Sequence, residues 1–174
     1  MEQLKLIPKK LLLFMKESPK KAYILYIGNN YSHKNLDRLK RAFDKLVKEY
    51  NLNYELKLIT EIIGEEELDN LYKNASLFVL PSLCEGFGLP PLEAMKRGIP
   101  VVCSNICSLV EILGEAAIYF NPLDINEMAE KIKKVLENKD LRKSLRERGF
   151  ELMKKYSWQR MAKETLRIYE KTPH

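Results

Sequence analysis

Apolar residues along the chain follow two alternating patterns: short continuous runs, and longer stretches with helical spacing. The short runs, typical of buried strands, are Tyr23–Ile27, Leu77–Leu80, Val101–Cys103 and Ala117–Phe120, with a longer run of strand-forming residues over Tyr54–Ile63. Helical spacing predicts helices over 36–50, 65–74, 91–97, 109–113, 141–156 and 157–171, and one more that begins after Asp124.

Strands that alternate with helices form right-handed β-α-β units around a parallel sheet. We therefore expect an α/β fold, a single Rossmann-like domain with a parallel sheet of about five strands flanked by helices on both faces. The length of 174 residues suits one domain with a substantial core. Ser18-Pro19 marks a boundary between a basic leader or interdomain linker, residues 1–20, and the folded domain, residues 21–174.

Two helix starts carry recognisable capping residues. Asp124 is followed three positions later by Glu127, an arrangement similar to a capping box, and Ser157 is placed to cap the last helix. Tyr156 and Trp158 flank this second start, and we expect them to pack the last helix onto the sheet.

Ligands of open parallel sheets bind beyond the carboxyl ends of the strands. That rule selects the loops Gly28–Lys34 and Pro81–Pro90, which follow the first and third predicted strands. In the second loop, Gly86 and Gly88 allow the backbone to approach a ligand closely. The helix that starts with the following prolines adds the positive end of its dipole, so we expect an anion site here.

Two carboxylates accompany this loop. Glu85 lies within it and Glu93 lies eight positions later, about one turn into the predicted helix. Glu85 is placed to reach a ligand at the strand ends, and Glu93 lies beneath the loop. The alternative for Glu93 is a residue that faces solvent or completes the helix cap.

Charge and cysteine content narrow the class of protein. The net charge of +6 is concentrated at the two basic ends of the chain. Basic ends can contact a nucleic acid or an anionic membrane. We favour the interpretation that they are solvated helix faces, and we expect no nucleic-acid partner. No apolar run of the chain, Leu11–Met15 included, is long enough to cross a bilayer, and no signal peptide is visible. We expect a cytoplasmic protein, with peripheral contact at the inner membrane face through the basic leader as an alternative to a linker role. Three cysteines and two histidines, widely spread, predict reduced thiols and no metal site.

The segment EGFGLPPLE resembles the Glu-x7-Glu signature of the glycosyltransferase group 1 family (family 4, GT-B fold). GNNYSHKNLDRLKRAF resembles the first glycine loop and helix of that family, with Lys34 and Asn35 at its Lys-Asn step. Further likeness in EELDNLYKNASLFVLPS, GIPVVCSNICSLVEILGEAAIYFNP and KYSWQRMAKETLRIYEK extends the resemblance over roughly residues 23–171. The chain is similar to the C-terminal, donor-binding half of a GT-B fold.

The resemblance implies a nucleotide-sugar-binding domain of a retaining hexosyltransferase in polysaccharide, lipopolysaccharide or glycolipid synthesis. It gives Glu85 and Lys34 catalytic roles, with Glu85 facing the donor sugar and Lys34 neutralising the leaving diphosphate. Glu93 would bind the ribose hydroxyls. The donor site would be completed by two glycine-containing loops, namely Gly28, Asn29, Gly86, Phe87, Gly88 and Leu89. No cofactor and no metal are implied, and the donor would be a UDP- or GDP-sugar.

Three departures from the family pattern leave alternatives open. Asn29 stands where many members have an arginine, and no N-terminal acceptor-binding domain precedes the first strand, so the acceptor domain would belong to the same or a separate chain. Only Glu61–Gly64 separates the second strand from the next helix, so Tyr54–Ile63 is either one long strand that replaces two, or a strand is missing. The alternative functions are a non-catalytic nucleotide-diphosphate-binding or protein-interaction module, and one half of a two-chain enzyme.

Overall fold

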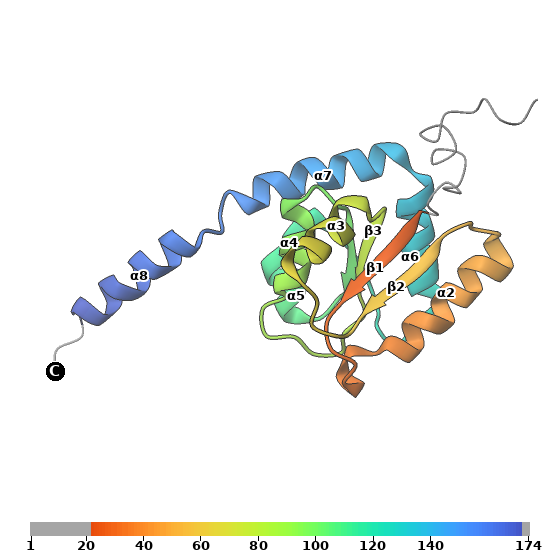
Figure 1. Ribbon diagram of the computed structural model, residues 1–174, viewed down its shortest axis with the longest axis horizontal. Coiled ribbons are helices and arrows are strands. Elements are labelled where there is room, and N and C mark those ends of the chain that lie inside the picture. The colour runs from red at the N-terminus through yellow and green to blue at the C-terminus, as the bar shows by residue number, and fades with distance from the viewer. Residues whose placement is uncertain (1–21, 172–174) are drawn as a thin grey trace, which may run out of the picture.

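A computed structural model describes residues 22–171 (Figure 1). The strands are β1 (Tyr23–Ile27), β2 (Glu55–Ile59), β3 (Leu77–Leu80), β4 (Val101–Ser104) and β5 (Ala117–Phe120). The helices are α2 (Leu36–Tyr50), α3 (Glu65–Asn74), α4 (Leu89–Lys96), α5 (Cys107–Leu113), α6 (Ile125–Glu137), α7 (Lys139–Met153) and α8 (Trp158–Lys171), with the 3-10 turns η1 (Ser32–Lys34) and η2 (Gly114–Ala116).

All five strands are parallel and lie in the order β2-β1-β3-β4-β5, which confirms the expected α/β fold. The order reverses direction after β2, so right-handed crossovers place α2 on one face of the sheet and α3, α4 and α5 on the other. Helix α6 returns to the face of α2 and packs against it (Figure 1). This reversal creates a switch point between β1 and β3.

Strands β1, β3 and β4 lie at the centre of the sheet, and their sequences are continuously apolar. Every residue of β3 and β4 is buried, as are the first four residues of β1. Strands covered by helices on both faces need such runs, because neither face meets water. The core therefore lies along β1, β3 and β4, and the loops at the carboxyl ends of these strands start directly from it.

The segment Tyr54–Ile63 contains one short strand, which corrects one of the two expectations for it. Strand β2 has five residues, so it is not one long strand that replaces two. No strand lies between 60 and 64, and α3 itself supplies the crossover to β3 on the far side of β1. With α3 included, the connection is long enough for a parallel crossover.

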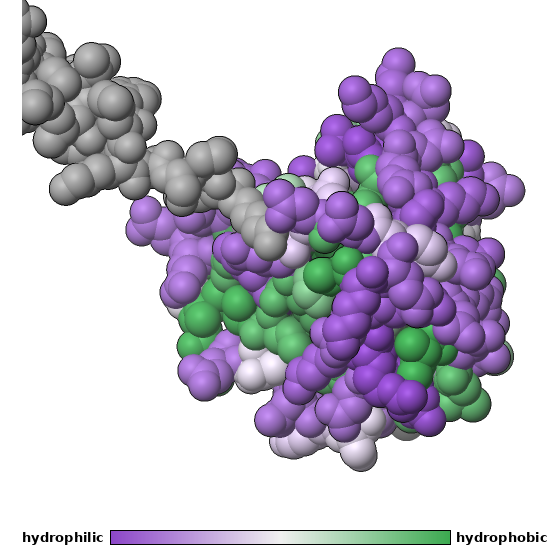
Figure 2. Space-filling view, turned by 90° about the vertical axis from the view of Figure 1, so that its right-hand side faces the viewer, coloured by the Kyte–Doolittle hydropathy of each residue, from purple (hydrophilic) through white to green (hydrophobic). Residues whose placement is uncertain are grey.

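On the α3 side of the sheet, β2 carries charged side chains and, within residues 22–171, is not covered by a further helix. Glu55 is exposed, and the ammonium group of Lys57 lies 3.9 Å from the ring centroid of Tyr23. The Tyr23 hydroxyl donates to the carbonyl of Leu71 in α3. Charged residues on an edge strand also discourage pairing with another sheet. Seen from the side of α2 and β2, the surface is mostly hydrophilic, with separate apolar areas between the polar side chains (Figure 2).

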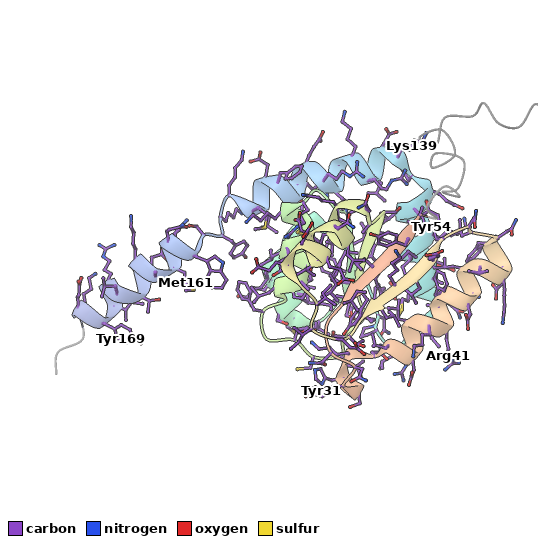
Figure 3. All side chains as sticks on the ribbon, viewed as in Figure 1. Tyr31, Arg41, Tyr54, Lys139, Met161 and Tyr169 are labelled. Carbon is purple, nitrogen blue, oxygen red and sulfur yellow. The ribbon has the colours of Figure 1, made fainter. Side chains whose placement is uncertain are left out.

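Helix α8 extends away from the body of the domain (Figure 1). It buries no residue, and its side chains at Met161 and Tyr169 lie far from the sheet (Figure 3). The expectation that Tyr156 and Trp158 pack this helix onto the sheet is wrong for Trp158, whose side chain is 69% exposed. Tyr156 instead reaches the domain before α8 begins, and its hydroxyl donates to the carbonyl of Ile112.

The structure does not test the predicted boundary between a leader or linker and the domain. The predicted leader or linker over residues 1–20 lies outside the described residues. Within residues 22–171, no helix has the length and apolar character needed to span a membrane.

Candidate functional site

The switch point between β1 and β3 brings together the two loops that the sequence selected. Chain segments leave these neighbouring strands toward opposite faces of the sheet, the arrangement at which open parallel sheets bind ligands. We call the region between the two loops the crevice. The loop after β1 leads through η1 into α2, and the loop after β3 leads into α4. A backbone hydrogen bond from the Leu83 amide to the His33 carbonyl, 2.7 Å, joins the loops directly.

An ion pair between Lys34 and Glu85 lies across this crevice. The Lys34 Nζ is 2.7 Å from Oε1 of Glu85, and the side chains are only 14% and 12% exposed. The hydroxyl of Ser82, a buried residue, donates to the same carboxylate oxygen at 2.6 Å. Two predicted site residues from distant parts of the chain therefore meet in one partly buried, hydrogen-bonded group.

Asn35, the residue after Lys34, anchors this part of the loop to neighbouring loops. Its Nδ2 group donates to the carbonyls of Pro81, 3.0 Å, and Pro122, 2.8 Å, so one buried amide ties together the loops after β1, β3 and β5. The backbone of Asn35 has a φ of 59°, a left-handed conformation that asparagine tolerates better than most residues. Arg38 in α2 donates to its side-chain oxygen at 3.0 Å.

The glycine loop before α4 is shaped by Gly88. This residue has a φ of +84°, and a Cβ atom placed on it would lie 2.6 Å from Cδ2 of Leu109. Only glycine fits this combination of backbone angle and close approach. Gly86, in contrast, has no atom within 4 Å of a Cβ position, so the space beside it is open.

Side chains around the glycine loop hold its backbone and leave part of its surface exposed. The Ser108 hydroxyl donates to the Glu85 carbonyl at 2.9 Å. Phe87 packs edge-on against Tyr156, with ring centroids 5.8 Å apart, yet it is 42% exposed, and Leu89 is 46% exposed. Both predicted residues are therefore partly open to solvent and do not belong to the core.

Gly28 and Asn29 form the turn that follows β1. A Cβ atom at Gly28 would lie 2.7 Å from the hydroxyl oxygen of Tyr26, which itself donates to the Asn29 carbonyl at 2.7 Å. Burial, with a smaller contribution from the negative charge of Glu85, raises the pKa of Tyr26 to about 12. The Tyr26 hydroxyl thus stays a proton donor next to the crevice, and the Asn29 side chain is exposed.

Glu93 lies in α4 with its residue exposed to solvent. Its Oε2 accepts a hydrogen bond of 2.9 Å from the hydroxyl of Tyr72, a buried residue of α3. Burial and the nearby Glu93 carboxylate both raise the pKa of Tyr72 well above its ordinary value. Glu93 therefore faces solvent, as one alternative expected, and does not cap α4, whose N-cap is Gly88. Its carboxylate is in addition hydrogen-bonded to a buried phenol.

Sequence reasoning missed three polar residues that organise this region: Ser82, Ser108 and Tyr72. The serines had no signal beyond their nearness to the glycine loop, or to the helix that packs on it. Tyr72 follows a leucine in an amphipathic helix, where an aromatic residue usually indicates core packing, and its hydroxyl partner is 21 positions away.

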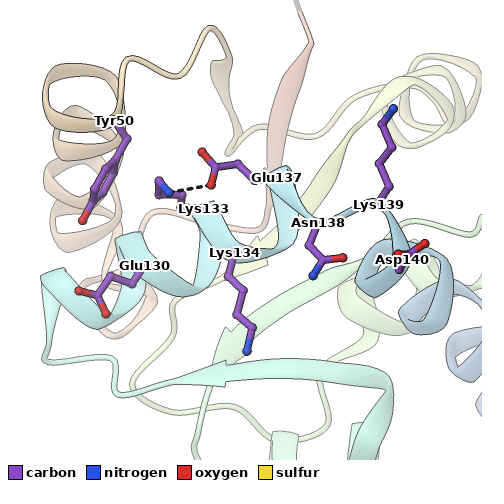
Figure 4. Close-up of a pocket in the computed structure, with 8 residues that line it drawn as sticks. All are labelled: Tyr50, Glu130, Lys133, Lys134, Glu137, Asn138, Lys139 and Asp140. Atoms are coloured by element: carbon purple, nitrogen blue, oxygen red, sulfur yellow. Dashed lines mark hydrogen bonds and ion pairs between the residues drawn. The ribbon is translucent and has the colours of Figure 1, made fainter.

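A hollow elsewhere in the structure is unrelated to the site between the two loops. It lies where α2 ends and α6 passes into α7 (Figure 4), and it is lined by Tyr50, Glu130, Lys133, Lys134, Glu137, Asn138, Lys139 and Asp140. Lysines and acidic residues balance each other here, and Lys133 already pairs with Glu137 at 2.6 Å. Figure 3 shows Lys139 of this hollow and Tyr31, which lies in the loop after β1, on opposite sides of the domain. In residues 22–171, no group of three or more potential metal ligands gathers at either place.

Comparison with known proteins is consistent with the crevice geometry. The sequence profile described as glycosyl transferases group 1 matches residues 45–152. The O-antigen chain mannosyltransferase B of Escherichia coli is 34% identical over 85% of this chain and 45% of its own length. The MMP alpha-(1->4)-mannosyltransferase of Mycolicibacterium hassiacum is 33% identical over 74% of this chain and 32% of its own length. The chain thus spans less than half the length of these curated relatives.

Solved structures show the same fold. The C-terminal domain of a glycosyl transferase group 1 family protein (LpcC) from Francisella tularensis has a TM-score of 0.69 at 20% identity, covering 85% of this chain and 92% of that domain. The sucrose-phosphate synthase of Thermosynechococcus elongatus has a TM-score of 0.72 at 23% identity, covering 94% of this chain and 48% of that enzyme. With the profile match across more than half of its residues, the chain belongs to the group 1 glycosyl transferases, and its fold is that of one half of a GT-B enzyme.

Proposed function

We propose that this chain is the donor domain of a retaining hexosyltransferase, the part that binds the nucleotide sugar. The enzyme acts in polysaccharide, lipopolysaccharide or glycolipid synthesis, and its donor is a UDP- or GDP-sugar bound without a resident cofactor or metal. One observation carries the proposal: the Lys34–Glu85 ion pair at the switch point, 2.7 Å long and partly buried, beside a glycine loop. This placement is where open parallel sheets bind nucleotides.

Lys34 supplies the positive charge for the diphosphate. As the bond between the anomeric carbon and the phosphate oxygen breaks, negative charge grows on the leaving diphosphate. A cation already held in position stabilises this charge without reorganising at that moment. A charge-assisted hydrogen bond of this kind contributes about 1.5–3 kcal/mol.

Backbone N–H groups of Gly86–Leu89 supply the remaining donors. The two residues that follow, Pro90 and Pro91, have no N–H group, so the first turn of α4 offers fewer donors than an ordinary helix start. The phosphates and the donor sugar would therefore be held by the loop itself. Gly86 leaves open space in which a ligand can approach the backbone.

The two glutamates have separate tasks in this proposal. Glu85 faces the donor sugar and orients Lys34, whereas Glu93 binds the ribose hydroxyls from α4. Gly28 and Asn29 form the wall of the site on the β1 side. Because the curated relatives are named as mannosyltransferases, a mannosyl donor is the first to test.

The acceptor is bound elsewhere in this proposal. The chain spans less than half the length of its curated relatives, and the acceptor-binding domain would lie N-terminal to it in the same chain or in a separate chain. Cytoplasmic location, with peripheral contact at the inner membrane face, completes the proposal.

A thermal-shift panel with UDP, GDP, ADP and their sugar conjugates tests the proposal. Ligand at about 100 times its Kd adds ~2.7 kcal/mol to the free energy of unfolding, which raises the Tm by roughly 5–10 °C for a chain of this size. We expect a shift with one base, and we expect Lys34→Ala to weaken binding at least tenfold. Lys40→Ala is the matched control, because Lys40 is an exposed lysine of α2 with only a loose ion pair, 3.9 Å, to Asp37.

Absence of a shift with every nucleotide would reject the donor-domain proposal. It would favour the alternative of a protein-interaction module that has lost its nucleotide site. A shift that Lys34→Ala leaves unchanged would show that the nucleotide binds outside the crevice.

A further inference from the structure

Tyr72 connects the interior of the domain to Glu93. Its ring is fully buried, tilted against Phe78 at a centroid distance of 6.0 Å. Its hydroxyl donates to Oε2 of Glu93 at 2.9 Å, and the next oxygen, the Pro90 carbonyl, is 3.4 Å away. The carboxylate is therefore the nearer of the two hydrogen-bond acceptors of this buried hydroxyl.

This hydrogen bond occupies only one of the two carboxylate oxygens. Within residues 22–171, the hydrogen bond from Tyr72 is the only one to the Glu93 carboxylate, and it is made to Oε2. Since the pKa of Tyr72 is raised by burial, the phenol remains a donor throughout the physiological pH range. The bond holds Oε2 and leaves Oε1 without a hydrogen bond from the described residues.

Arg97 is held where it does not neutralise Glu93. It stands four positions later in the chain, a spacing at which arginine usually pairs with glutamate on a helix. Its Nε instead donates to Asp69 of α3 at 2.9 Å, its guanidinium lies 4.8 Å from the Tyr72 ring centroid, and Nη1 donates to the backbone carbonyl of Glu93 at 3.2 Å. The described part of the chain has no cation in an ion pair with the Glu93 carboxylate, so no such pair competes with a ligand for it.

We infer that Tyr72 is a positioning residue for nucleotide recognition. By fixing Oε2 of Glu93, it directs Oε1 toward the two neighbouring hydroxyls of a ribose, and so contributes to the selection of ribonucleotides over deoxyribonucleotides. The inference rests on the proposed function, because it assigns Glu93 to the ribose. It adds a buried residue of α3 to the specificity of that site.

Tyr72→Phe tests the inference, because it removes the hydroxyl and keeps the buried ring. The Kd is measured by calorimetry for the nucleoside diphosphate that the chain binds, UDP or GDP, and for its 2′-deoxy and 3′-deoxy forms. We expect five- to tenfold weaker binding of the ribonucleotide, little change for the deoxy forms, and so a matching loss of discrimination. The Tm of the same sample reports whether the variant is folded.

Two further variants separate positioning from general stability. Tyr119→Phe is the control, because that hydroxyl also donates to a backbone carbonyl, Gly114 at 2.6 Å, but lies away from Glu93. It should leave discrimination unchanged. Glu93→Gln in the Tyr72→Phe background should cost less than it does alone, since the two residues act as one unit.

The possible results are distinguishable. If Tyr72→Phe binds ribo- and deoxyribonucleotides with the wild-type ratio, or weakens both equally along with the Tm, Tyr72 is a core residue only and the inference is wrong, while the proposed function stands. If the wild-type chain binds no nucleoside diphosphate, both are wrong.

Discussion

At the scale of single residues, the candidate site depends on a cation that is already paired. The Lys34 ammonium is held at 2.7 Å by the Glu85 carboxylate, and this pairing has two opposite effects on an arriving diphosphate. It orients Lys34, which favours binding, and it adds a negative charge beside the phosphates, which opposes binding. Bare nucleoside diphosphates and sugar donors should therefore respond differently when this charge is removed.

Glu85→Gln should bind a bare nucleoside diphosphate more tightly than the wild-type chain does. The amide oxygen can still accept from Lys34 and from Ser82, so the geometry is retained while the repulsion is lost. We expect a gain of roughly 1 kcal/mol, close to fivefold in Kd, measured by calorimetry. The sugar conjugate should gain less, because Glu85 also contacts the sugar in the proposed function.

Asp37→Asn is the control for this change, since it removes a carboxylate that is 99% exposed on α2. It should leave both affinities within twofold of wild type. Weaker binding of the bare diphosphate by Glu85→Gln would show that orientation of Lys34 outweighs repulsion.

The sequence placed Lys34 and Glu85 in one predicted site, but it did not predict the contacts that hold them there. Glu85 and Lys34 were named from motifs, and they meet in the structure. Asn35 was noted only as part of the Lys-Asn step, although its amide ties three loops together. Such contacts join positions that are 46 and 87 residues apart, and no local pattern encodes them.

At the scale of secondary-structure elements, helix α6 shows how one capping residue supports a buried face. The Asp124 side chain accepts hydrogen bonds from the amides of Asn126 and Glu127. The predicted capping box is only partly formed, because the Glu127 carboxylate accepts from the Asn121 amide instead of the Asp124 amide. The helix that follows buries Met128, Ala129, Ile132, Val135 and Leu136.

Asp124→Ala should destabilise the domain by about 1 kcal/mol, because two amides at the start of α6 lose their acceptor. Urea denaturation measures the change as a lower midpoint at an unchanged slope. Asp124→Asn keeps an acceptor oxygen at the same place and should recover most of the loss. Equal losses in both variants would mean that the negative charge, and not the hydrogen bonds, supports the helix start.

Most elements could be predicted from sequence because their signals are local. The limits of β1, β3 and β5 agree with the apolar runs that predicted them. The failures had tertiary causes. In Tyr54–Ile63, β2 pairs only with β1 among the described strands, and both strands end together at the Ile27–Ile59 pair. In α8, the amphipathic pattern predicts a buried face, but no described surface covers it.

At the scale of the whole molecule, the domain and α8 are separate in structure. The core is built from β1 to β5 and the helices up to α7, and Tyr156 is the last residue that packs against it. From Ser157 onward every described side chain is exposed. The stability of the domain and its nucleotide site should therefore not depend on α8.

A chain that ends after Tyr156 should accordingly fold like the full chain. Loss of an element that buries nothing changes the free energy of unfolding by no more than about 0.5 kcal/mol, or roughly 1–2 °C in Tm. Nucleotide affinity should be unchanged, since Lys34, Glu85 and Glu93 keep all their described partners.

A chain that ends before Tyr156 should behave differently. It loses the Tyr156 ring that packs against Phe87 and the hydrogen bond to the Ile112 carbonyl. The Tm should fall, and the glycine loop should become more mobile. If the longer truncation product already loses more than about 5 °C, α8 packs on the domain in solution and the separation is wrong.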